Sequence, residues 1–189
     1  MHFEKDVDYS TRVLEMGGLI LYPTDTVWGI GCDACNAEAV SKIYQLKQRP
    51  ESKSLIVLLA DPTALLHYVA APDPEIFDYI ETLEQPTTII YPNAIGLAEN
   101  LLADDHSVAI RIVKDEFCRH LLKRFRKPIV STSANISGEP APQFYNEVSP
   151  LIRDGVDYIV KHRQEDHEPR RPSTVVKWEG QGRVTVIRE

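Results

Sequence analysis

The stretch PIVSTSANISG, residues 128–138, joins an apolar run to a run of small polar side chains. Pro128, Ile129 and Val130 are typical of a buried strand, and hydroxyl and amide groups follow before Gly138. Ligands of open α/β sheets bind outside the strand ends, so the stretch predicts a sheet strand with a ligand site at its end. Residues 131–138 contain no carboxylate, histidine or cysteine, and neutral groups suit an anionic ligand because carboxylates would repel it. The alternative is an ST-turn, in which the hydroxyls bond to their own backbone.

Working outward, the rest of the chain alternates strands with helices. Helices are predicted at residues 6–16, 36–47, from 62, 74–84, 115–126 and 145–153. Further strands are predicted at residues 19–22, 55–59, 87–91, 108–113, 157–160, 174–178 and 184–187. This alternation favours a layered α/β domain, and the final hairpin requires antiparallel pairing, so the sheet should be mixed. PTDTVWGIG (23–31) is predicted to be a turn, and the polar residues 161–173 a mobile surface loop.

Length and composition indicate one globular domain over residues 1–189. A hydrophobic content of 43% argues against disorder, and no apolar run is long enough to span a membrane. The acidic N-terminus lacks the pattern of a signal peptide, so we expect a cytoplasmic protein. A net charge of -7 weighs against a protein that coats nucleic acid, although a local basic pocket is compatible with it.

Cysteine chemistry is a weak hypothesis for this chain. Cys32 and Cys35 form a CxxC between a strand-like stretch and a helix start, where a redox pair can lie. A structural zinc site needs four ligands, and no second pair of cysteines is present. We therefore expect no metal site, and Cys118 is expected in the core because it shares an apolar helical face.

A basic cluster follows the helix predicted at residues 36–47. Lys47, Arg49 and Lys53 fall within seven residues, close to a buried strand. Cations at a helix C-terminus complement the helix dipole, which accounts for Lys47 and for Arg49 but not for Lys53 beyond Pro50. A loop that holds three cations against the sheet could instead clamp a polyphosphate.

Arg111 lies inside the apolar strand SVAIRIV, residues 107–113. Burying an arginine there is costly unless an anion pairs with it. The anion could be a structural carboxylate of the chain or the carboxylate of a ligand. Together these features indicate an α/β protein that binds anions, with a nucleotide as one candidate ligand.

Four stretches in fixed order carry a resemblance to a known family: YPTDTVWGIGCDA, LKQRPESKSLIVLLA, SVAIRIV and KPIVSTSANISGEPAP. From about residue 10 to its end the chain resembles the YrdC/TsaC family of threonylcarbamoyl-AMP synthases, in the short form with a single YrdC-like domain. The pairing of a KxR motif (Lys47, Arg49) with an SxN motif (Ser133, Asn135) is the most specific part of the resemblance. The fold implied is a twisted, open, mixed β-sheet flanked by helices, with a basic cavity on one face.

The resemblance implies a nucleotidyltransferase, an L-threonylcarbamoyladenylate synthase that makes threonylcarbamoyl-AMP and pyrophosphate from L-threonine, bicarbonate and ATP. A Mg²⁺ ion would accompany ATP, and a separate transferase complex would move the threonylcarbamoyl group to tRNA. Family members are also described as binding double-stranded RNA. The alternative is thus a double-stranded RNA-binding module without catalysis, against which the net charge argues as the sole role.

The resemblance assigns roles by position. Lys47, Arg49 and Lys53 would act on the phosphates of ATP as catalytic residues. The threonine-binding residues would be Thr26, Arg111, Ser131 and Ser173. The nucleotide-binding residues would be Arg49, Lys53, Ser107, Ser133, Asn135 and Arg188.

Two positions depart from the family pattern. Leu58 stands in a strand where many relatives carry histidine, although short-form members also have an aliphatic residue there. LEQPTT (83–88) keeps only Pro86 and Thr88 of a longer motif, which bears on how one edge of the cavity is built.

Overall fold

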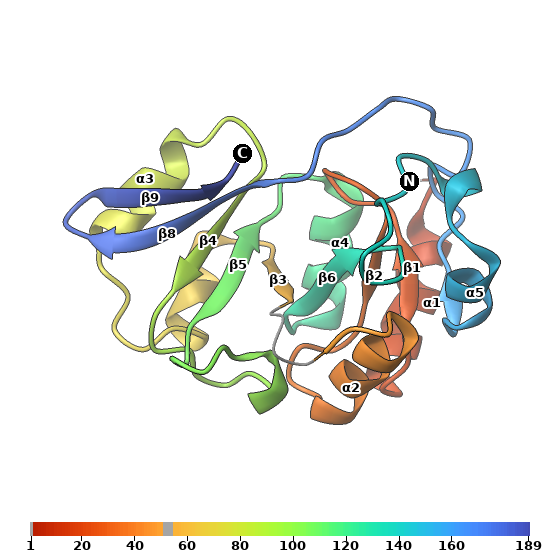
Figure 1. Cartoon of the computed structure of the whole chain (residues 1–189), viewed down its shortest axis with the longest axis horizontal. Helices are drawn as coiled ribbons and strands as arrows, with labels where there is room; N and C mark the ends of the chain where they lie inside the picture. Colours follow the sequence, from red (N-terminus) through yellow and green to blue (C-terminus); the bar gives the residue numbers. More distant parts are fainter. Residues whose placement is uncertain (1, 51–54) are drawn as a thin grey trace.

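The computed structural model describes residues 2–50 and 55–189, and the strands in these residues form one mixed, twisted sheet (Figure 1). The order across the sheet is β7-β1-β2-β6-β3-β5-β4-β8-β9. The pairs β1–β7, β3–β5 and β4–β8 are parallel and the other neighbours are antiparallel, which confirms the mixed α/β prediction. The strands are β1 (Ile20–Tyr22), β2 (Gly29–Gly31), β3 (Ile56–Leu59), β4 (Thr87–Tyr91), β5 (Val108–Ile112), β6 (Ile129–Ser133), β7 (Tyr158–Ile159), β8 (Thr174–Gly180) and β9 (Arg183–Arg188).

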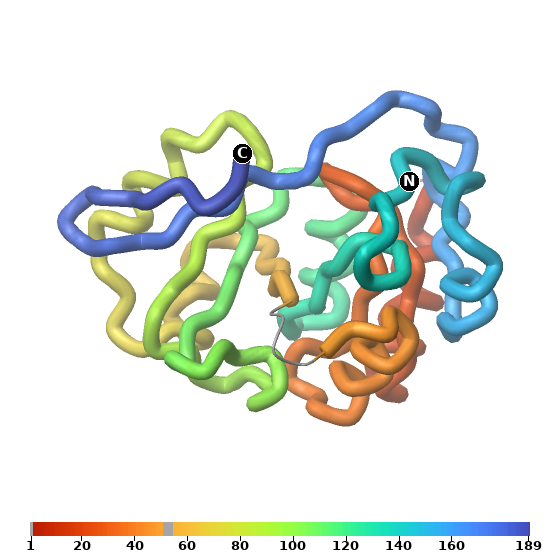
Figure 2. The backbone as a smooth tube through the Cα atoms, viewed as in Figure 1, coloured from red at the N-terminus to blue at the C-terminus, as the bar shows by residue number. Residues whose placement is uncertain are grey.

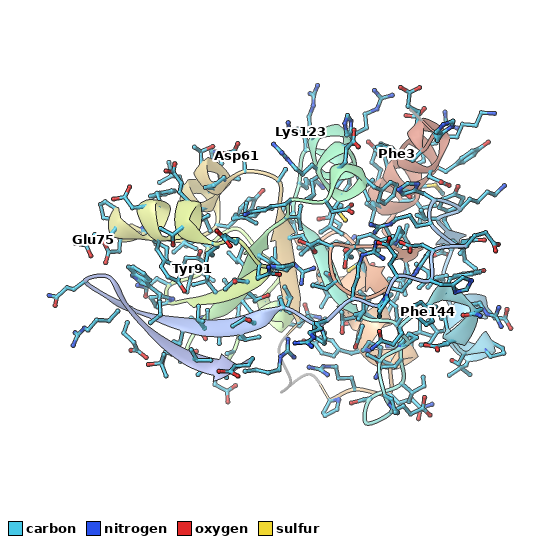
Figure 3. The ribbon with its side chains drawn as sticks, turned by 90° about the horizontal axis from the view of Figure 1, so that it is seen from above. Phe3, Asp61, Glu75, Tyr91, Lys123 and Phe144 are labelled. Atoms are coloured by element: carbon cyan, nitrogen blue, oxygen red, sulfur yellow. The ribbon has the colours of Figure 1, made fainter. Side chains whose placement is uncertain are left out.

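Helices cover both faces of the sheet. On one face α1 (Glu4–Glu15) packs against α4 (Glu116–Phe125) over a buried cluster that includes Leu14, Leu58 and Leu121. On the other face the larger core includes buried residues of α2 (Ala37–Leu46), the 3-10 helix η1 (Pro62–His67) and α3 (Glu75–Thr82). The remaining helices are η2 (Glu99–Leu101), η3 (Tyr145–Glu147) and α5 (Pro150–Asp154). Figure 3 shows Phe3 and Lys123, near α1 and in α4, on the side of the molecule opposite Phe144.

The register of the sheet determines which residues share the α1–α4 face. Leu58, buried in the α1–α4 cluster, pairs with Arg111 of β5 and with Ile129 of β6. Two residues earlier on β3, Ile56 pairs with Ser131. Because alternate residues of a strand point to the same face, Arg111 and Ser131 lie on the α1–α4 face of the sheet.

Strand β2 was missed from sequence, where residues 23–31 were predicted to be a turn. The strand is only Gly-Ile-Gly, which is too short to show an alternating pattern, yet it pairs with β1 and β6. A Cβ on Gly31 would lie 2.9 Å from the carbonyl oxygen of Val130, so close approach of the backbones requires glycine there. Two helix predictions were also inexact: the segment from Pro62 is a 3-10 helix, and residues 145–153 divide into η3 and α5.

The segment 161–173 lacks regular structure, as predicted, and runs from β7 to β8 along one side of the molecule (Figure 2). Its mobility stays a prediction, while contacts with residues distant in the sequence hold its start. The ring of His162 lies 5.0 Å from that of Phe3, and Arg163 donates to Asp115 at 2.9 Å. Composition predicted polarity, but it could not reveal partners that lie far away in the sequence.

Helices of the described segments are all too short or too polar to cross a bilayer.

Candidate ligand-binding site

A cavity of about 370 Å³ lies on the α1–α4 face, between the two halves of the sheet. Its walls come from β2, β3, β4, β5, β6 and β8, from the loops after α2 and before β8, and from β9. Most of the ligand residues predicted from the sequence meet in its lining. They are Thr26, Arg49, Arg111, Ser131, Ser133, Ser173 and Arg188.

The charged residues that line this cavity, among those described, are three arginines. Arg49, Arg111 and Arg188 contribute guanidinium groups to its wall, and the described lining residues include no aspartate or glutamate. The other polar groups are hydroxyls of serine and threonine. Fixed cations beside neutral donors make a site that attracts a multiply charged anion and does not repel it.

Lys47 holds the loop that carries the SxN motif. Lys47 is 1% exposed, and its ammonium donates to the carbonyl oxygens of Ser133 (2.5 Å) and Asn135 (2.6 Å). Burial, with a smaller contribution from Arg49, lowers the pKa of Lys47 to about 8, so the ammonium is still mainly protonated at neutral pH. Lys47 does not line the cavity, and its predicted contact with ATP phosphates stays a prediction.

Asn135 shapes the same loop. Its amide nitrogen donates to the carbonyl oxygens of Ile136 (3.1 Å) and Glu139 (2.6 Å). The side chain is therefore used within the loop and is absent from the described cavity lining. The KxR and SxN motifs are thus joined in space, as the resemblance implies, with Lys47 and Asn135 behind the wall and Arg49 and Ser133 on it.

Arg111 pairs with a carboxylate of the chain itself. Its Nη2 lies 3.1 Å from Oδ1 of Asp25, and both side chains are largely buried. The sequence left open a structural or a ligand carboxylate, and the structure supplies the first. The alignment is poor, because Nε and Nη2 of Arg111 and Oδ1 of Asp25 have no hydrogen-bond partner in the described structure.

Ser173 and Arg188 close the cavity at the C-terminal hairpin. The Ser173 hydroxyl lies 2.8 Å from that of Thr88, a cavity residue that the site prediction did not include. Arg188 donates to the carbonyl oxygen of Ser173 at 2.9 Å. The retained Thr88 of LEQPTT was a signal that could have found this contact.

Thr26 lies in a short turn before β2, and the hydroxyl group of Thr24 stabilises this turn. The hydroxyl of Thr24 accepts from the backbone N–H of Thr26 (3.0 Å) and donates to the carbonyl oxygen of Val27 (2.8 Å). This ST-turn places Thr26 on the cavity wall. The alternative of a turn that satisfies its own backbone, offered for Ser131, Ser133 and Asn135, does not describe the two serines, because both belong to β6, but the side chain of Asn135 does bond to backbone oxygens of its own loop.

Two predicted residues lie elsewhere. Ser107 lines a separate cavity of about 380 Å³, which shares Ile90 with the first one. Its predicted nucleotide contact remains a prediction. Lys53 lies outside the residues that the structure describes. Leu58, the departure from the family pattern, is buried against α1 and α4 and does not line the cavity.

The CxxC motif has the environment of a structural turn. Cys32 is fully buried, and Asp33 accepts from the backbone N–H of Cys35 at 2.8 Å and from Lys127 at 2.8 Å. Burial, with Asp33 next, raises the pKa of Cys32 above its usual range and that of Cys35 to about 11. A thiol with a raised pKa is a poor nucleophile at neutral pH. Nowhere in residues 2–50 and 55–189 do three or more metal-ligating side chains cluster.

One family model and several known proteins match this chain over most of its length. The family model for Sua5/YciO/YrdC, described as "Telomere recombination", matches residues 12–189. Threonylcarbamoyl-AMP synthase of Idiomarina loihiensis is 37% identical over 146 residues, which is 76% of this chain and 78% of that protein. Threonylcarbamoyl-AMP synthase of Vibrio campbellii is 32% identical over 174 residues, 90% of this chain and 93% of that protein.

Solved structures share the fold. P. abyssi Sua5 complexed with L-threonine superposes with a TM-score of 0.86 at 24% identity over 98% of this chain. The chain spans about half of that protein, 54% of its length. E. coli YciO gives a TM-score of 0.83 at 20% identity and covers 98% of this chain and 89% of its own.

Proposed function

The chain belongs to the Sua5/YciO/YrdC family, and we propose that it is an L-threonylcarbamoyladenylate synthase, a nucleotidyltransferase that uses L-threonine, bicarbonate and ATP. Its products would be threonylcarbamoyl-AMP and pyrophosphate. The relatives that carry this name match most of their own length, and a Sua5 of the same fold is described with L-threonine.

One observation carries the proposal: three arginines and a rim of neutral hydroxyls line one cavity, and the described lining residues include no carboxylate side chain. ATP brings several negative charges and threonine brings one more. A cavity of this composition can neutralise both ligands side by side, whereas an acidic wall would repel them.

The reaction needs no nucleophile from the protein. The amine of threonine forms a bond to the carbon of bicarbonate, a C–O bond of bicarbonate breaks and water leaves with a proton of the amine, which gives a carbamate. A carbamate oxygen then attacks the α-phosphorus of ATP, the bond from that phosphorus to the bridging oxygen breaks, and pyrophosphate leaves. Such a reaction depends on positioning the reactants and neutralising charge, which is what this wall offers.

We assign the residues of the wall accordingly. Arg111 would bind the threonine carboxylate, and Arg49 and Arg188 would bind the phosphates of ATP. The other cavity residues would orient the two substrates through hydroxyl groups: Thr26, Ser131, Ser133 and Ser173. Lys47 and Asn135 would act through the loop that they hold.

Mg²⁺ would enter with ATP. The described lining supplies no carboxylate, so it does not form a cage for a divalent cation held by the protein alone. Mg²⁺ keeps several water ligands and binds readily to phosphate oxygens, so we assign the ion to the nucleotide.

The test is incubation with ATP, L-threonine and bicarbonate, followed by mass detection of threonylcarbamoyl-AMP and measurement of pyrophosphate. Arg111→Ala should reduce the rate by about tenfold or more, equivalent to about 1.4 kcal/mol in the transition state. Arg124→Ala is the matched control, because Arg124 is exposed, pairs with Asp8 and does not line the cavity. A wild-type rate for Arg111→Ala would refute the assignment, and no product from wild type would refute the function. The same loss is expected for Lys53→Ala.

Two partners follow from the proposed reaction and its family. A transferase complex would consume threonylcarbamoyl-AMP, because a mixed carbamic–phosphoric anhydride is an activated group donor. Binding of duplex RNA remains a prediction that no contact in the described structure favours. Titration of labelled duplex RNA at two salt concentrations, with and without ATP, would test it.

A further inference from the structure

Asp25 is an acidic residue next to the cavity that the proposed function leaves without a role. It follows β1, and its carboxylate lies 3.1 Å from the guanidinium of Arg111. The exposed fractions of the two side chains are 12% and 3%, so the pair is largely removed from water. Arg111 is also the residue to which the proposed function assigns the threonine carboxylate.

The Asp25–Arg111 pair leaves donors of the guanidinium unused. Nε and Nη2 of Arg111 are buried and have no hydrogen-bond partner among the described residues, and neither has Oδ1 of Asp25. A guanidinium carries five N–H donors in a planar fork, and a buried donor without a partner costs free energy. Arg111 therefore has free donors for a second carboxylate, and binding one would remove the free-energy cost of leaving those donors unpaired.

The other groups that face Asp25 make it a poor place for one more negative charge. Asp115, just before α4, lies near Asp25 and pairs at 2.9 Å with Arg163 of the 161–173 segment. Two neutral groups also face it: the phenol of Tyr22 and the thiol of Cys118, whose pKa values burial raises. Lys114, next to Asp115 in the sequence, faces Asp25 with its backbone N–H, while its ammonium donates to the carbonyl oxygen of Leu83.

The ionisation of Asp25 is set by these neighbours. Burial raises its pKa, Arg111 lowers it, Asp115 raises it, and hydrogen bonds from the backbone N–H groups of Asp25 and Lys114 lower it, with a net shift upward. Arg111, Asp25, Asp115 and Arg163 together carry two positive and two negative charges. A ligand carboxylate on Arg111 adds a negative charge that nothing in this group balances.

We propose that Asp25 is a positioning residue for Arg111 that takes up a proton when the carboxylate of threonine binds to the same guanidinium. The inference rests on the proposed function, which places threonine there. Two carboxylates that share one partner at close range cannot both stay ionised at low cost, so the more buried carboxyl group binds a proton. The proton comes from solvent and forms an O–H bond on Asp25, and no other bond changes.

Proton uptake by Asp25 links the affinity for threonine to the pH, and the direction of this dependence can be stated. Proton uptake on binding means that the affinity for threonine falls as the pH rises. The fall occurs between the pKa of Asp25 in the free protein and its higher pKa in the complex. A purely structural role of Asp25 would not produce this pH dependence.

The experiment is isothermal titration calorimetry with L-threonine, alone and with a non-hydrolysable ATP analogue. Titrations in two buffers of different ionisation enthalpy, at about pH 6 and about pH 7.5, give the number of protons taken up. Wild type should take up a substantial fraction of a proton per threonine and bind several-fold more weakly at the higher pH. Asp25→Asn should take up none, and the matched control Asp8→Asn, at an exposed salt bridge, should behave as wild type.

Each result of these titrations either supports or overturns the inference. Wild-type proton uptake by Asp25→Asn overturns the inference, and so does threonine binding to wild type without uptake, which leaves the proposed function intact. No threonine binding to wild type in either titration overturns both. If Asp25→Asn fails to fold, Asp115→Asn keeps a cap acceptor for α4 and removes the negative charge beside Asp25. It should shift proton uptake to lower pH, and unchanged uptake would overturn the inference.

Discussion

At the scale of single residues, the structure distinguishes side chains that line the cavity from side chains that hold the loops around it. Lys47 and Arg49 are two positions apart, yet Lys47 donates to backbone oxygens of the loop 133–135 while Arg49 lines the cavity. The ammonium of Lys47 replaces water for two partly buried carbonyl groups. Its first effect is therefore on the position of Ser133, whatever further contact it makes with a phosphate.

Lys47→Ala should lower the free energy of unfolding by about 2–4 kcal/mol, because it leaves two partly buried carbonyl oxygens without their donor and opens a void where the buried side chain of Lys47 lies. Urea denaturation followed by circular dichroism measures the change. Lys123→Ala, at an exposed position of α4, is the control and should change stability by less than about 0.5 kcal/mol. Equal stability of the two variants would show that the ammonium contributes nothing to the loop.

At the scale of elements, the 161–173 segment is a polar strap with buried ends. Asp6 of α1 accepts from Tyr158 Oη (2.6 Å) and from the backbone N–H groups of Lys161 and His162. At the other end Ser173 meets Thr88. The strap therefore joins α1 and the start of α4 to the wall of the cavity, and its position matters for the site.

Arg163→Ala should loosen the strap, because Arg163 bonds both to Asp115 and to the carbonyl oxygen of Thr24 (2.7 Å), close to Thr26. Hydrogen–deuterium exchange of residues 161–173 should become about tenfold faster, a loss of about 1.4 kcal/mol in local stability. Arg171→Ala, at an exposed position of the same strap, should leave exchange unchanged. Identical exchange in both variants would contradict the anchoring role.

At the scale of the whole molecule, the cavity exists only because distant parts of the chain converge. Thr26 and Gly29 stand near the start of the sequence and Arg188 near its end, and all three line the same space. The strand order brings them together, since β2 and β6 form one wall and β4 and β8 the opposite one. The hairpin of β8 and β9 thus belongs to the site as well as to the sheet.

Arg188→Ala should raise the KM for ATP by about tenfold, because it removes one of the cavity's guanidinium groups without touching the core. Arg183→Ala is matched in residue type, strand and exposure, but Arg183 does not line the cavity, so its KM should equal that of wild type. Steady-state pyrophosphate release over a range of ATP concentrations measures both. Equal KM values for the two variants would remove Arg188 from the nucleotide site.

The fold was largely predictable, because long apolar runs and helical periodicity are local properties. Strands such as Thr87–Tyr91 and helix Glu116–Phe125 appear within a residue or so of their predicted bounds. Strand Gly29–Gly31 could not be found in this way, since glycine carries no burial pattern and the strand forms only because β1 and β6 flank it. Residue types and spacing indicated Arg49, Arg111, Ser131 and Ser133 of the cavity lining, whereas Thr26, Ser173 and Arg188 were expected only from the family resemblance.

The sequence by itself determined the chemical inventory of this protein: arginines and hydroxyls suited to anions, a KxR and an SxN motif, and membership of a family. Only the tertiary structure decided how that inventory is used, namely that Lys47 faces a loop, that Asp25 shares Arg111, and that the 161–173 strap is anchored. The reason is physical. A residue's chemistry is carried in its own side chain, whereas its partners and its burial depend on groups far away along the chain, which only folding brings within reach.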